Sequence, residues 1–330
     1  MTTRRIAGRS VSAIGLGCMN LSHAYGTPPP EAEAQRLLLR ALELGVDFFD
    51  TAALYGFGAN EELVGRTLSA HRSRFFLASK CGMQGVNGVR VIDGRADTIK
   101  ATCEDSLRRL RTDHIDLYYL HRWDKKVAIE ESVGAMADLV REGKIGSIGL
   151  SEVSGATLHR AHAVHPIAAL QSEYSLWTRN PELGALAACR ELNVAFVAFS
   201  PLGRGYLGGT LNDVSTLDAK DIRRSMPRFA PQTYALNLPL LNEARLVADE
   251  AHCTLAQLAL AWLLARGDDI IPIPGTVQRS HLEDNLGAAR VTLNASHMAR
   301  LDAVFARERI HGARYNEASM AEVDSEEYPA

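Results

Sequence analysis

The sequence has few cysteines and lacks the patterns that would give them a structural role. Only five occur in 330 residues, at positions 18, 81, 103, 189 and 253, and no two form a C-x-x-C pair. An odd number of scattered cysteines argues against a disulfide framework and a zinc knuckle, and it favours free thiols in a reducing compartment. We therefore expect a cytoplasmic protein.

Long hydrophobic runs are absent as well. No apolar stretch approaches the roughly 18 residues that a membrane span requires, and Arg9 interrupts the N-terminal segment before a signal-peptide core could form. Neither charge is in excess, because 36 Lys and Arg stand against 39 Asp and Glu, a net charge of −3. Nucleic acids and membranes are therefore not expected partners. The sequence does not indicate the oligomeric state.

What the chain does contain is a regular alternation of short apolar strands and amphipathic helices. We predict eight strands within residues 12–19, 47–52, 75–81, 115–122, 145–152, 168–175, 194–200 and 269–276. Eight strand–helix units over this length favour an α/β fold of the closed (β/α)8 TIM-barrel type over an open doubly wound sheet. We expect a single domain over 1–330, with its core at about 3–306 and a mobile acidic C-terminal tail at 307–330.

Local signals mark several boundaries within this pattern. Helices are predicted to stop at Gly45 and Gly143, and Asn60 is predicted to cap a helix that begins NEELV. Residues 3–11 are expected to form a hairpin over the bottom of the barrel. Residues 201–242, which are rich in glycine and proline, are expected to form a long loop after the seventh strand.

Ionisable side chains lie at the predicted C-terminal ends of three consecutive strands, where barrel enzymes carry their active sites. Asp50 ends the second strand, and Tyr55 follows it by five residues. Lys80 ends the third strand and His121 the fourth. Four different titratable types in these places favour a common site. The alternative interpretation is a plain Lys80–Asp50 salt bridge beside a packed tyrosine and a core histidine.

Two further motifs favour other chemistry less well. Gly203–Gly208 matches the dinucleotide fingerprint G-x-G-x-x-G, but no apolar helix follows it and it comes after the seventh strand rather than the first. His159, His162 and His165 have a repeated spacing of three. On a helix the first and last of them diverge by about 120°, so we expect no metal site.

Seven motifs, in order, resemble those of the aldo-keto reductase family. They are DTAALYG at 50–56, SKCG at 79–82, YLHRWD at 119–124, GKIGSIGLSEVS at 143–154, QSEYS at 171–175, FSPLGRG at 199–205 and PIPGT at 272–276. The resemblance implies a nicotinamide-dependent oxidoreductase that reduces an aldehyde or ketone to the alcohol, reversibly and without a metal. It also implies that Asp50, Tyr55, Lys80 and His121 are the catalytic tetrad.

The residue types of this tetrad suit carbonyl reduction. Hydride addition places negative charge on the carbonyl oxygen, so a proton donor must lie beside it. Tyr55 can donate that proton, and we expect the Lys80 ammonium to lower the pKa of the phenol from its ordinary value of about 10. Asp50 would keep Lys80 charged and aimed, and a neutral His121 would hydrogen-bond the substrate oxygen.

The resemblance further implies NADPH lying across the mouth of the barrel, with Ser151 and Gln171 at its carboxamide and Phe199 stacked on its nicotinamide. The implied cofactor residues are Gly17, Cys18, Met19, Asp50, Ser151, Gln171, Phe199, Ser200, Leu202, Gly203, Arg204, Gly205, Gly275, Thr276, Arg279, Asp284 and Asn285. Glu152 stands where many members have Asn, and Phe199 where many have Tyr.

Cofactor preference depends on a further departure from the family pattern. Val277 and Gln278 replace positions that are often basic in NADPH-preferring relatives, so only Arg279 remains nearby to pair with a 2′-phosphate. The sequence therefore predicts NADPH, with NADH as the alternative.

Aromatic residues near the mouth predict an apolar substrate pocket formed by Tyr25, Phe57, Trp123 and Trp177. Arg122 or Arg179 could contact a polar group of the substrate. The sequence does not choose among aldehydes, ketones and quinones. Two other functions stay open, a nicotinamide-binding regulatory or redox-sensing subunit with little turnover, and a non-redox barrel enzyme that uses Lys80 as a Schiff-base amine.

Overall fold

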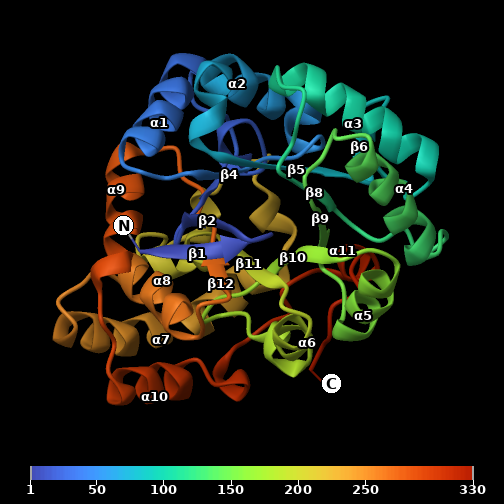
Figure 1. Cartoon of the computed structure of the whole chain (residues 1–330). Coiled ribbons are helices and arrows are strands. Elements are labelled where there is room, and N and C mark those ends of the chain that lie inside the picture. The colour runs from blue at the N-terminus through green and yellow to red at the C-terminus, as the bar shows by residue number, and fades with distance from the viewer. Residues whose placement is uncertain (1, 329–330) are drawn as a thin grey trace.

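A closed barrel of eight parallel strands forms the centre of the molecule, a computed structural model that describes residues 2–328 (Figure 1). In their order around the sheet, the strands are β3 (Leu16–Gly17), β4 (Phe48–Asp50), β5 (Phe76–Cys81), β8 (Leu117–Leu120), β9 (Ile148–Ser151), β10 (Ile167–Glu173), β11 (Ala195–Phe199) and β12 (Ile270–Pro272). The Gly15 N–H donates to Pro272 O at 3.0 Å and the Gly17 N–H to Pro274 O at 3.3 Å, so the last strand joins the first. The predicted (β/α)8 barrel is confirmed, and every strand overlaps its predicted range.

Apolar side chains fill the barrel interior. The cluster contains Phe48, Phe76, Ala78, Leu117, Tyr119, Ala169, Ala195, Val197, Ile271 and Ile273, together with Ile6 and Val11 from the N-terminal hairpin of β1 (Thr3–Ile6) and β2 (Arg9–Ser12). A Cβ at Gly149 would lie 2.3 Å from the Tyr119 ring, so glycine is needed there for the ring to cross the interior. The hairpin closes the N-terminal end of the barrel, as the sequence predicts.

Helices cover the outside of the barrel. Those between or beside consecutive strands are α1 (Glu31–Glu43), α2 (Ala59–Leu68), α3 (Ala96–Leu110), α4 (Ile129–Arg141), α5 (Gly155–Val164), α6 (Ala185–Glu191), α8 (Leu255–Ala265) and α9 (Arg279–Gly287). The first and fourth helices end before Gly45 and Gly143, which take φ values of 87° and 74° as expected of glycine after a helix. Within residues 2–328, we find no helix with the length and apolar character needed to span a bilayer.

The predicted cap of α2 is wrong. The helix begins after Gly58, and Asn60 lies inside its first turn with a fully buried side chain. The Asn60 side chain accepts a hydrogen bond from Thr51 Oγ1 at 2.6 Å and donates to Cys18 O at 2.9 Å. Asn60 therefore joins the segments that follow β3 and β4, which is a tertiary role that its local sequence does not show.

The segment 201–242 is only partly the expected loop. Short 3₁₀ turns occupy its first part, but α7 (Pro231–Glu250) is a helix of 20 residues that contains Pro239. Proline normally interrupts a helix because it lacks an N–H donor. Pro239 therefore led us to predict a loop where the chain forms α7. Pro231 starts the helix favourably, and its buried face, which includes Leu240, Leu241 and Val247, holds it against the rest of the chain.

The acidic tail is packed on the molecule, contrary to the mobile segment expected from its composition. After α10 (Ala295–Val304), the chain returns to the barrel and forms α11 (Glu317–Ala321). Ser154 Oγ donates to Asp324 Oδ2 at 3.0 Å, and the Gly155 N–H donates to Glu326 Oε1 at 2.8 Å. Carboxylates are favoured there because they meet the positive N-terminal end of α5. Residues 329–330 of the predicted tail, like residue 1, lie outside the described residues.

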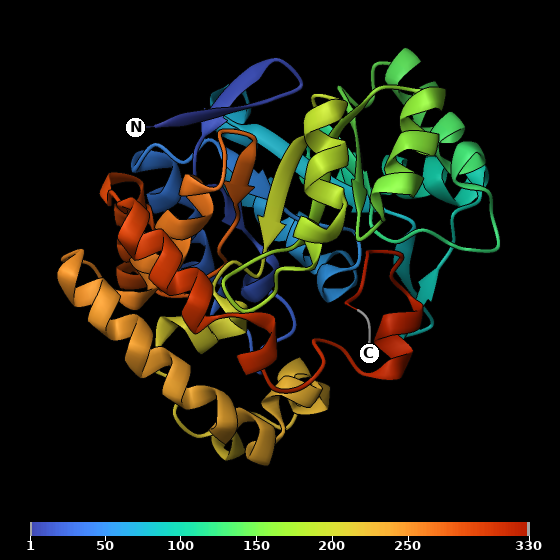
Figure 2. The same cartoon turned by 90° about the horizontal axis from the view of Figure 1, so that it is seen from below.

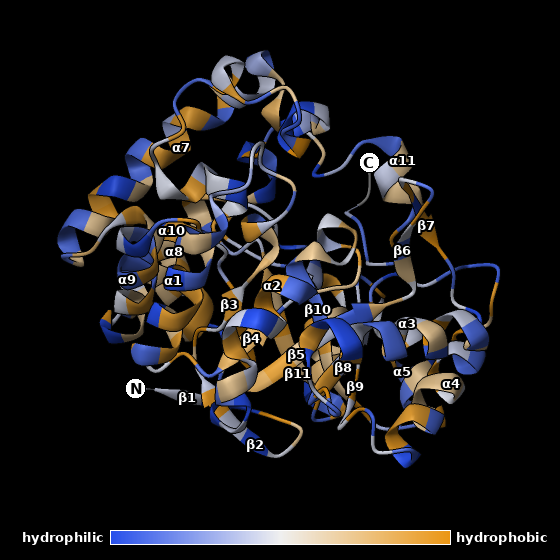
Figure 3. Ribbon diagram, turned by 90° about the horizontal axis from the view of Figure 1, so that it is seen from above, coloured by the Kyte–Doolittle hydropathy of each residue, from blue (hydrophilic) through white to orange (hydrophobic). Residues whose placement is uncertain are grey.

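Three segments gather at the C-terminal end of the barrel, opposite the hairpin of β1 and β2 (Figures 2 and 3). They are α7, the tail with α11, and a second hairpin made of β6 (Met83–Val86) and β7 (Val89–Ile92). Figure 3 shows α7 on one side of this end and α11 with the second hairpin on the other. These segments surround the region in which the strand-end residues meet.

Candidate active site

A cavity of about 910 Å³ opens at the C-terminal ends of the barrel strands. This volume lies in the upper part of the range of about 300–1,000 Å³ that is usual for ligand sites. Its floor is formed by residues at or just beyond strand ends, namely Gly17, Asp50, His121, Ser151, Gln171 and Phe199. The site therefore lies at the end of the barrel where enzymes of this architecture carry their chemistry.

Lys80 links the predicted catalytic residues from beneath the cavity. Its side chain is fully buried and pairs with Asp50 Oδ1, and its Nζ lies 2.9 Å from Thr51 O and 3.3 Å from Tyr55 Oη. Asp50 is held in turn by Gln171, whose Nε2 donates to Oδ2 at 2.7 Å. The neighbouring strands β4 and β5 bring Asp50 and Lys80 together, as their predicted strand-end positions require.

Tyr55 and His121 face the cavity beside this buried pair. Their rings meet edge to face, with centroids 5.7 Å apart and an angle of 84° between planes. Tyr55 enters from a tight turn in which Gly56 takes a φ of 58°, and a Cβ at Gly56 would lie 3.1 Å from Ser22 O. Among residues 2–328, His121 Nδ1 is buried without a hydrogen-bond partner. The structure thus brings all four predicted residues together.

Burial decides the protonation states of this group. Burial raises the pKa of Tyr55 by more than the Lys80 ammonium lowers it. The sequence-based expectation that Lys80 brings the pKa of Tyr55 below its ordinary value is therefore wrong, and the net shift is a rise. Burial opposes the charge of Lys80, but Asp50 and Tyr55 together raise the pKa of Lys80 above its ordinary value. Burial and the Arg122 charge hold the pKa of His121 well below its usual range. At neutral pH the site therefore holds a neutral phenol, an ammonium and a neutral imidazole.

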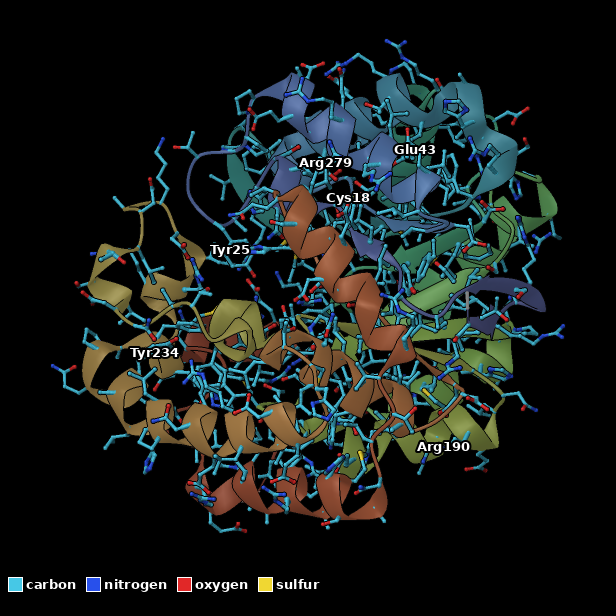
Figure 4. All side chains as sticks on the ribbon, turned by 90° about the vertical axis from the view of Figure 1, so that its left-hand side faces the viewer. Cys18, Tyr25, Glu43, Arg190, Tyr234 and Arg279 are labelled. Carbon is cyan, nitrogen blue, oxygen red and sulfur yellow. The ribbon has the colours of Figure 1, made fainter. Side chains whose placement is uncertain are left out.

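Most of the predicted cofactor residues line the cavity. They are Gly17, Met19, Asp50, Ser151, Gln171, Phe199, Ser200, Leu202, Arg204, Gly205, Gly275, Thr276, Asp284 and Asn285. Cys18 and Gly203 are not among them, because Cys18 is fully buried and Gly203 is covered by the Trp177 ring. Arg279 is exposed at the first position of α9, outside the cavity wall (Figure 4).

The donors along this wall fit an extended dinucleotide. Thr276, Val277 and Gln278 precede α9 and line the cavity, and the first N–H groups of that helix have no acceptors within the helix. A Cβ at Gly275 would lie 2.6 Å from Asn20 Oδ1, so glycine leaves room for a close backbone approach. Helix N–H groups and glycine backbone suit phosphate, whereas Ser151 and Gln171 offer the polar atoms that an amide requires.

Three of the four predicted substrate-pocket aromatics do not line the cavity. Tyr25 does so (Figure 4). Trp177 is buried in a stack with Tyr206, with ring centroids 3.9 Å apart, and Trp123 Nε1 donates to Val127 O at 2.8 Å. Phe57 is 54% exposed, and its ring covers Gly85 of the β6–β7 hairpin. These rings support loops instead of forming the pocket.

Residues from segments far apart in the sequence form an outer wall of the cavity, and the sequence did not predict that they belong to the site. They are His23, Met83 and Arg90 near the β6–β7 hairpin, Met226 before α7, and Tyr315, Ser319 and Glu322 of the tail. Arg90 and Glu322 form an ion pair between the hairpin and the tail. No local pattern marks these residues, because each reaches the cavity from a loop, a hairpin or the tail that folds over the barrel mouth.

Glu152, a departure from the family pattern, points away from the cavity and into the protein. It has a φ of 55° and is buried, and its carboxylate lies 2.8 Å from Arg314 Nη2. Burial opposes this charge, but Arg314 lowers the pKa of Glu152 to about 2. The Glu173 N–H also donates to Glu152 Oε1 at 2.8 Å. Glu152 therefore anchors the tail instead of facing the predicted carboxamide site.

The remaining motifs lie apart from this chemistry. The histidines 159, 162 and 165 lie on or beside α5, and within residues 2–328 no group of His, Cys, Asp and Glu is arranged to hold a metal ion. Burial raises the pKa of the Cys81 thiol, which favours an unreactive packed thiol. Gly205 and Gly208 line the cavity from a 3₁₀ turn that is not followed by a Rossmann helix.

Comparison with known proteins gives one consistent result. The family model described as "Aldo/keto reductase family" matches residues 13–306. The chain is 42% identical over 320 residues to "Aldo-keto reductase yakc [NADP(+)]" of Schizosaccharomyces pombe, covering 95% of this chain and 94% of that protein. It is 40% identical over 311 residues to "Probable aldo-keto reductase 1" of Glycine max, covering 93% and 89%. The structure of the glycerol dehydrogenase AKR11B4 from Gluconobacter oxydans superposes with a TM-score of 0.85 at 27% identity, covering 99% and 98%.

Proposed function

The chain belongs to the aldo-keto reductase family, and from that premise we propose that it reduces an aldehyde or ketone to the alcohol, with NADPH as cofactor and Tyr55 as the proton donor. One observation carries the proposal: Lys80 Nζ lies 3.3 Å from the Tyr55 hydroxyl at the base of a cavity large enough for cofactor and substrate. The reverse reaction, oxidation of a secondary alcohol, uses the same groups.

The tetrad would act on the substrate oxygen. Tyr55 is neutral at physiological pH and holds the proton that the oxygen must receive. The buried Lys80 ammonium stabilises the phenolate left after the transfer, and Asp50 keeps that ammonium charged and in place. The neutral His121 ring offers a further hydrogen bond to the same oxygen. A reduced nicotinamide, when bound, supplies the hydride that adds to the carbonyl carbon.

The cofactor would be held along the wall described above. Phe199 presents its ring, Ser151 and Gln171 their polar atoms, and the N-terminal end of α9 its free N–H groups. NADPH is preferred in this proposal because the name of the S. pombe relative specifies NADP(+). Arg279, exposed at the start of α9, is the cation assigned to the 2′-phosphate.

The test follows oxidation of NADPH, and separately of NADH, by absorbance against a panel of aldehydes and ketones. In Tyr55→Phe we expect kcat to fall by about 100-fold or more because general-acid assistance is lost. NADPH binding, measured by fluorescence titration, should stay unchanged because Tyr55 is not assigned to the cofactor. If Tyr55→Phe keeps a kcat within about threefold of the wild type, Tyr55 is not the proton donor.

The same experiment separates the other two functions. Tight NADPH binding without turnover of any carbonyl compound would favour the regulatory subunit. The Schiff-base enzyme is disfavoured by geometry, because Lys80 is fully buried, is engaged by Asp50, Thr51 and Tyr55, and does not line the cavity. A Lys80 adduct trapped by borohydride would reverse that conclusion.

A further inference from the structure

Arginine side chains line the cavity in four places within residues 2–328. Three of them have a carboxylate within ion-pairing distance, namely Arg90 with Glu322, Arg204 with Glu173 at 2.7 Å, and Arg223 with Asp221 at 2.6 Å. In each pair the positive charge is balanced by a residue of the chain itself. The fourth arginine, Arg122, differs from the others in this respect.

Arg122 has no acidic partner within 4.0 Å among residues 2–328. Only one of its nitrogens is engaged, since Nη1 donates to His121 O at 2.7 Å and to Ser151 Oγ at 3.1 Å. Its Nε and Nη2 have no hydrogen-bond partner there and are not fully enclosed, since neither is among the buried unsatisfied atoms. A guanidinium presents its donors as a planar fork that matches a carboxylate, and most of this fork is free.

The acids near Arg122 form their ion pairs with other cations. Among the nearby acids, Asp50 is paired with Lys80, and Glu152 is paired with Arg314. The adjacent His121 is neutral, and Arg122 itself contributes to that by lowering the pKa of the imidazole. The cavity therefore carries, directly after His121 in the chain, a guanidinium that forms no ion pair of its own, although its charge also acts on the more distant Glu152.

We propose that Arg122 binds a carboxylate of the substrate, so that the preferred substrates are aldehydes or ketones that carry a carboxylate a few bonds from the carbonyl group. The inference rests on the proposed reductase function, which places the carbonyl oxygen at Tyr55 and His121. An anion bound in a partly desolvated cavity gains more from a guanidinium than it would in water. The same charge also attracts anionic substrates into the cavity.

The test compares 4-carboxybenzaldehyde with its uncharged methyl ester, which shares the reacting aldehyde and the ring. We expect wild-type kcat/KM to favour the acid by about tenfold or more, and Arg122→Gln to lower kcat/KM for the acid by about 10- to 100-fold. The ester should change by less than about threefold. Arg122→Lys keeps the charge without the fork and should retain part of the preference. The preference should also shrink as salt is added.

Arg223→Gln is the matched control, since Arg223 also lines the cavity but is balanced by Asp221. Its ratio of acid to ester should stay near that of the wild type. Equal losses for acid and ester in Arg122→Gln would overturn the proposal and leave Arg122 as a positioning residue for Ser151. Equal use of acid and ester by the wild type would overturn it as well.

A second measurement keeps this inference separate from the proposed function. If neither compound is reduced, the reductase proposal fails, but binding of 4-carboxybenzaldehyde to the NADP⁺-saturated protein can still be measured by calorimetry. Binding that is lost in Arg122→Gln supports the anion site on its own. Binding that is absent in the wild type, or equal in wild type and variant, rejects it.

Discussion

A buried lysine is costly unless its charge is paired and its N–H donors are used. Lys80 meets both conditions, because Asp50 balances the charge and Thr51 O and Tyr55 Oη accept its remaining donors. The same arrangement gives Tyr55 a permanent cation on one side and the open cavity on the other. At the scale of single residues, the lysine is therefore a satisfied core group, and in the proposed mechanism it is also the charge that assists proton transfer.

The pH profile of the reaction follows from these states. In the proposed mechanism reduction needs the protonated phenol, and the raised pKa of Tyr55 means that the phenol loses its proton only at higher pH. We expect kcat/KM for reduction to stay flat from about pH 7 to about pH 9 and to fall only above about pH 10, the ordinary range of a phenol. Oxidation of an alcohol needs the phenolate and should rise with pH over the same range.

Stopped-flow or steady-state rates measured across this range, with circular dichroism to confirm folding at each pH, check the profile. In Tyr55→Phe the residual rate should lose this dependence because its source is removed. A fall in the reductive rate between about pH 7 and about pH 8 would show that another group supplies the proton.

At the scale of elements, the cavity is built in two layers of different origin. Strand ends form the inner layer, which holds Asp50, Lys80 and Gln171. Insertions form the outer layer, where the β6–β7 hairpin and the tail meet through Arg90 and Glu322. The buried Glu152–Arg314 pair connects the layers, because Glu152 follows β9 and Arg314 belongs to the tail.

Breaking this pair should release the tail. Arg314→Met leaves the Glu152 carboxylate buried without its ion-pair partner, and we expect a loss of about 3 kcal/mol in the free energy of unfolding. The double variant Glu152→Gln with Arg314→Met should recover part of that loss, because no unpaired charge remains. Urea denaturation measures both effects, and limited proteolysis reports whether the tail is more readily cut.

The direction in which the stability from this ion pair changes with pH supplies a control. The pKa of Glu152 is lowered to about 2 in the folded protein, so the stability it contributes is present above the ordinary carboxyl pKa and is lost as the pH falls toward about 2. Arg314→Met should therefore lose less stability, relative to wild type, at low pH than at neutral pH. An Arg314→Met variant as stable and as protease-resistant as the wild type at pH 7 would contradict the proposed role of the pair.

The inner layer was predictable from the sequence, whereas the outer layer was not. Alternating apolar periods locate the eight strands, and the residues after them converge because parallel strands end at one edge. Asn60, the tail and α7 were misjudged because tertiary contacts outweigh local signals there: Asn60 bonds to Thr51 and Cys18, and α7 tolerates Pro239. The aromatic residues were misplaced because a ring near the mouth packs as readily on a loop as in a pocket.

At the scale of the whole molecule, stability depends on the dense packing of the barrel interior. A Cβ at Gly149 would lie 2.3 Å from the buried Tyr119 ring, which is closer than atoms can approach. We expect Gly149→Ala to destabilise the protein by about 1–3 kcal/mol through overpacking. Thermal or urea unfolding monitored by circular dichroism measures the change.

Gly134→Ala is the matched control, because Gly134 lies inside α4 and a Cβ there meets nothing within 4 Å. The same substitution should stabilise the protein by about 0.5–1 kcal/mol, since alanine favours a helix over glycine. A loss of stability in Gly149→Ala together with a gain in Gly134→Ala would show that tight packing in the barrel interior, and not the loss of glycine itself, causes the destabilisation. Equal effects at both positions would contradict that conclusion.

The return of the chain to the barrel mouth also bears on how the protein is made. A ribosome adds residues from the N-terminus onward, so all eight strands are synthesised before Arg314, Tyr315, Ser319 and Glu322. Until those residues emerge, Glu152 lacks its guanidinium and the cavity lacks part of its wall. The cavity is therefore completed only after all eight strands have been synthesised, and a nascent barrel that has already folded would still lack the wall that residues 314–322 supply.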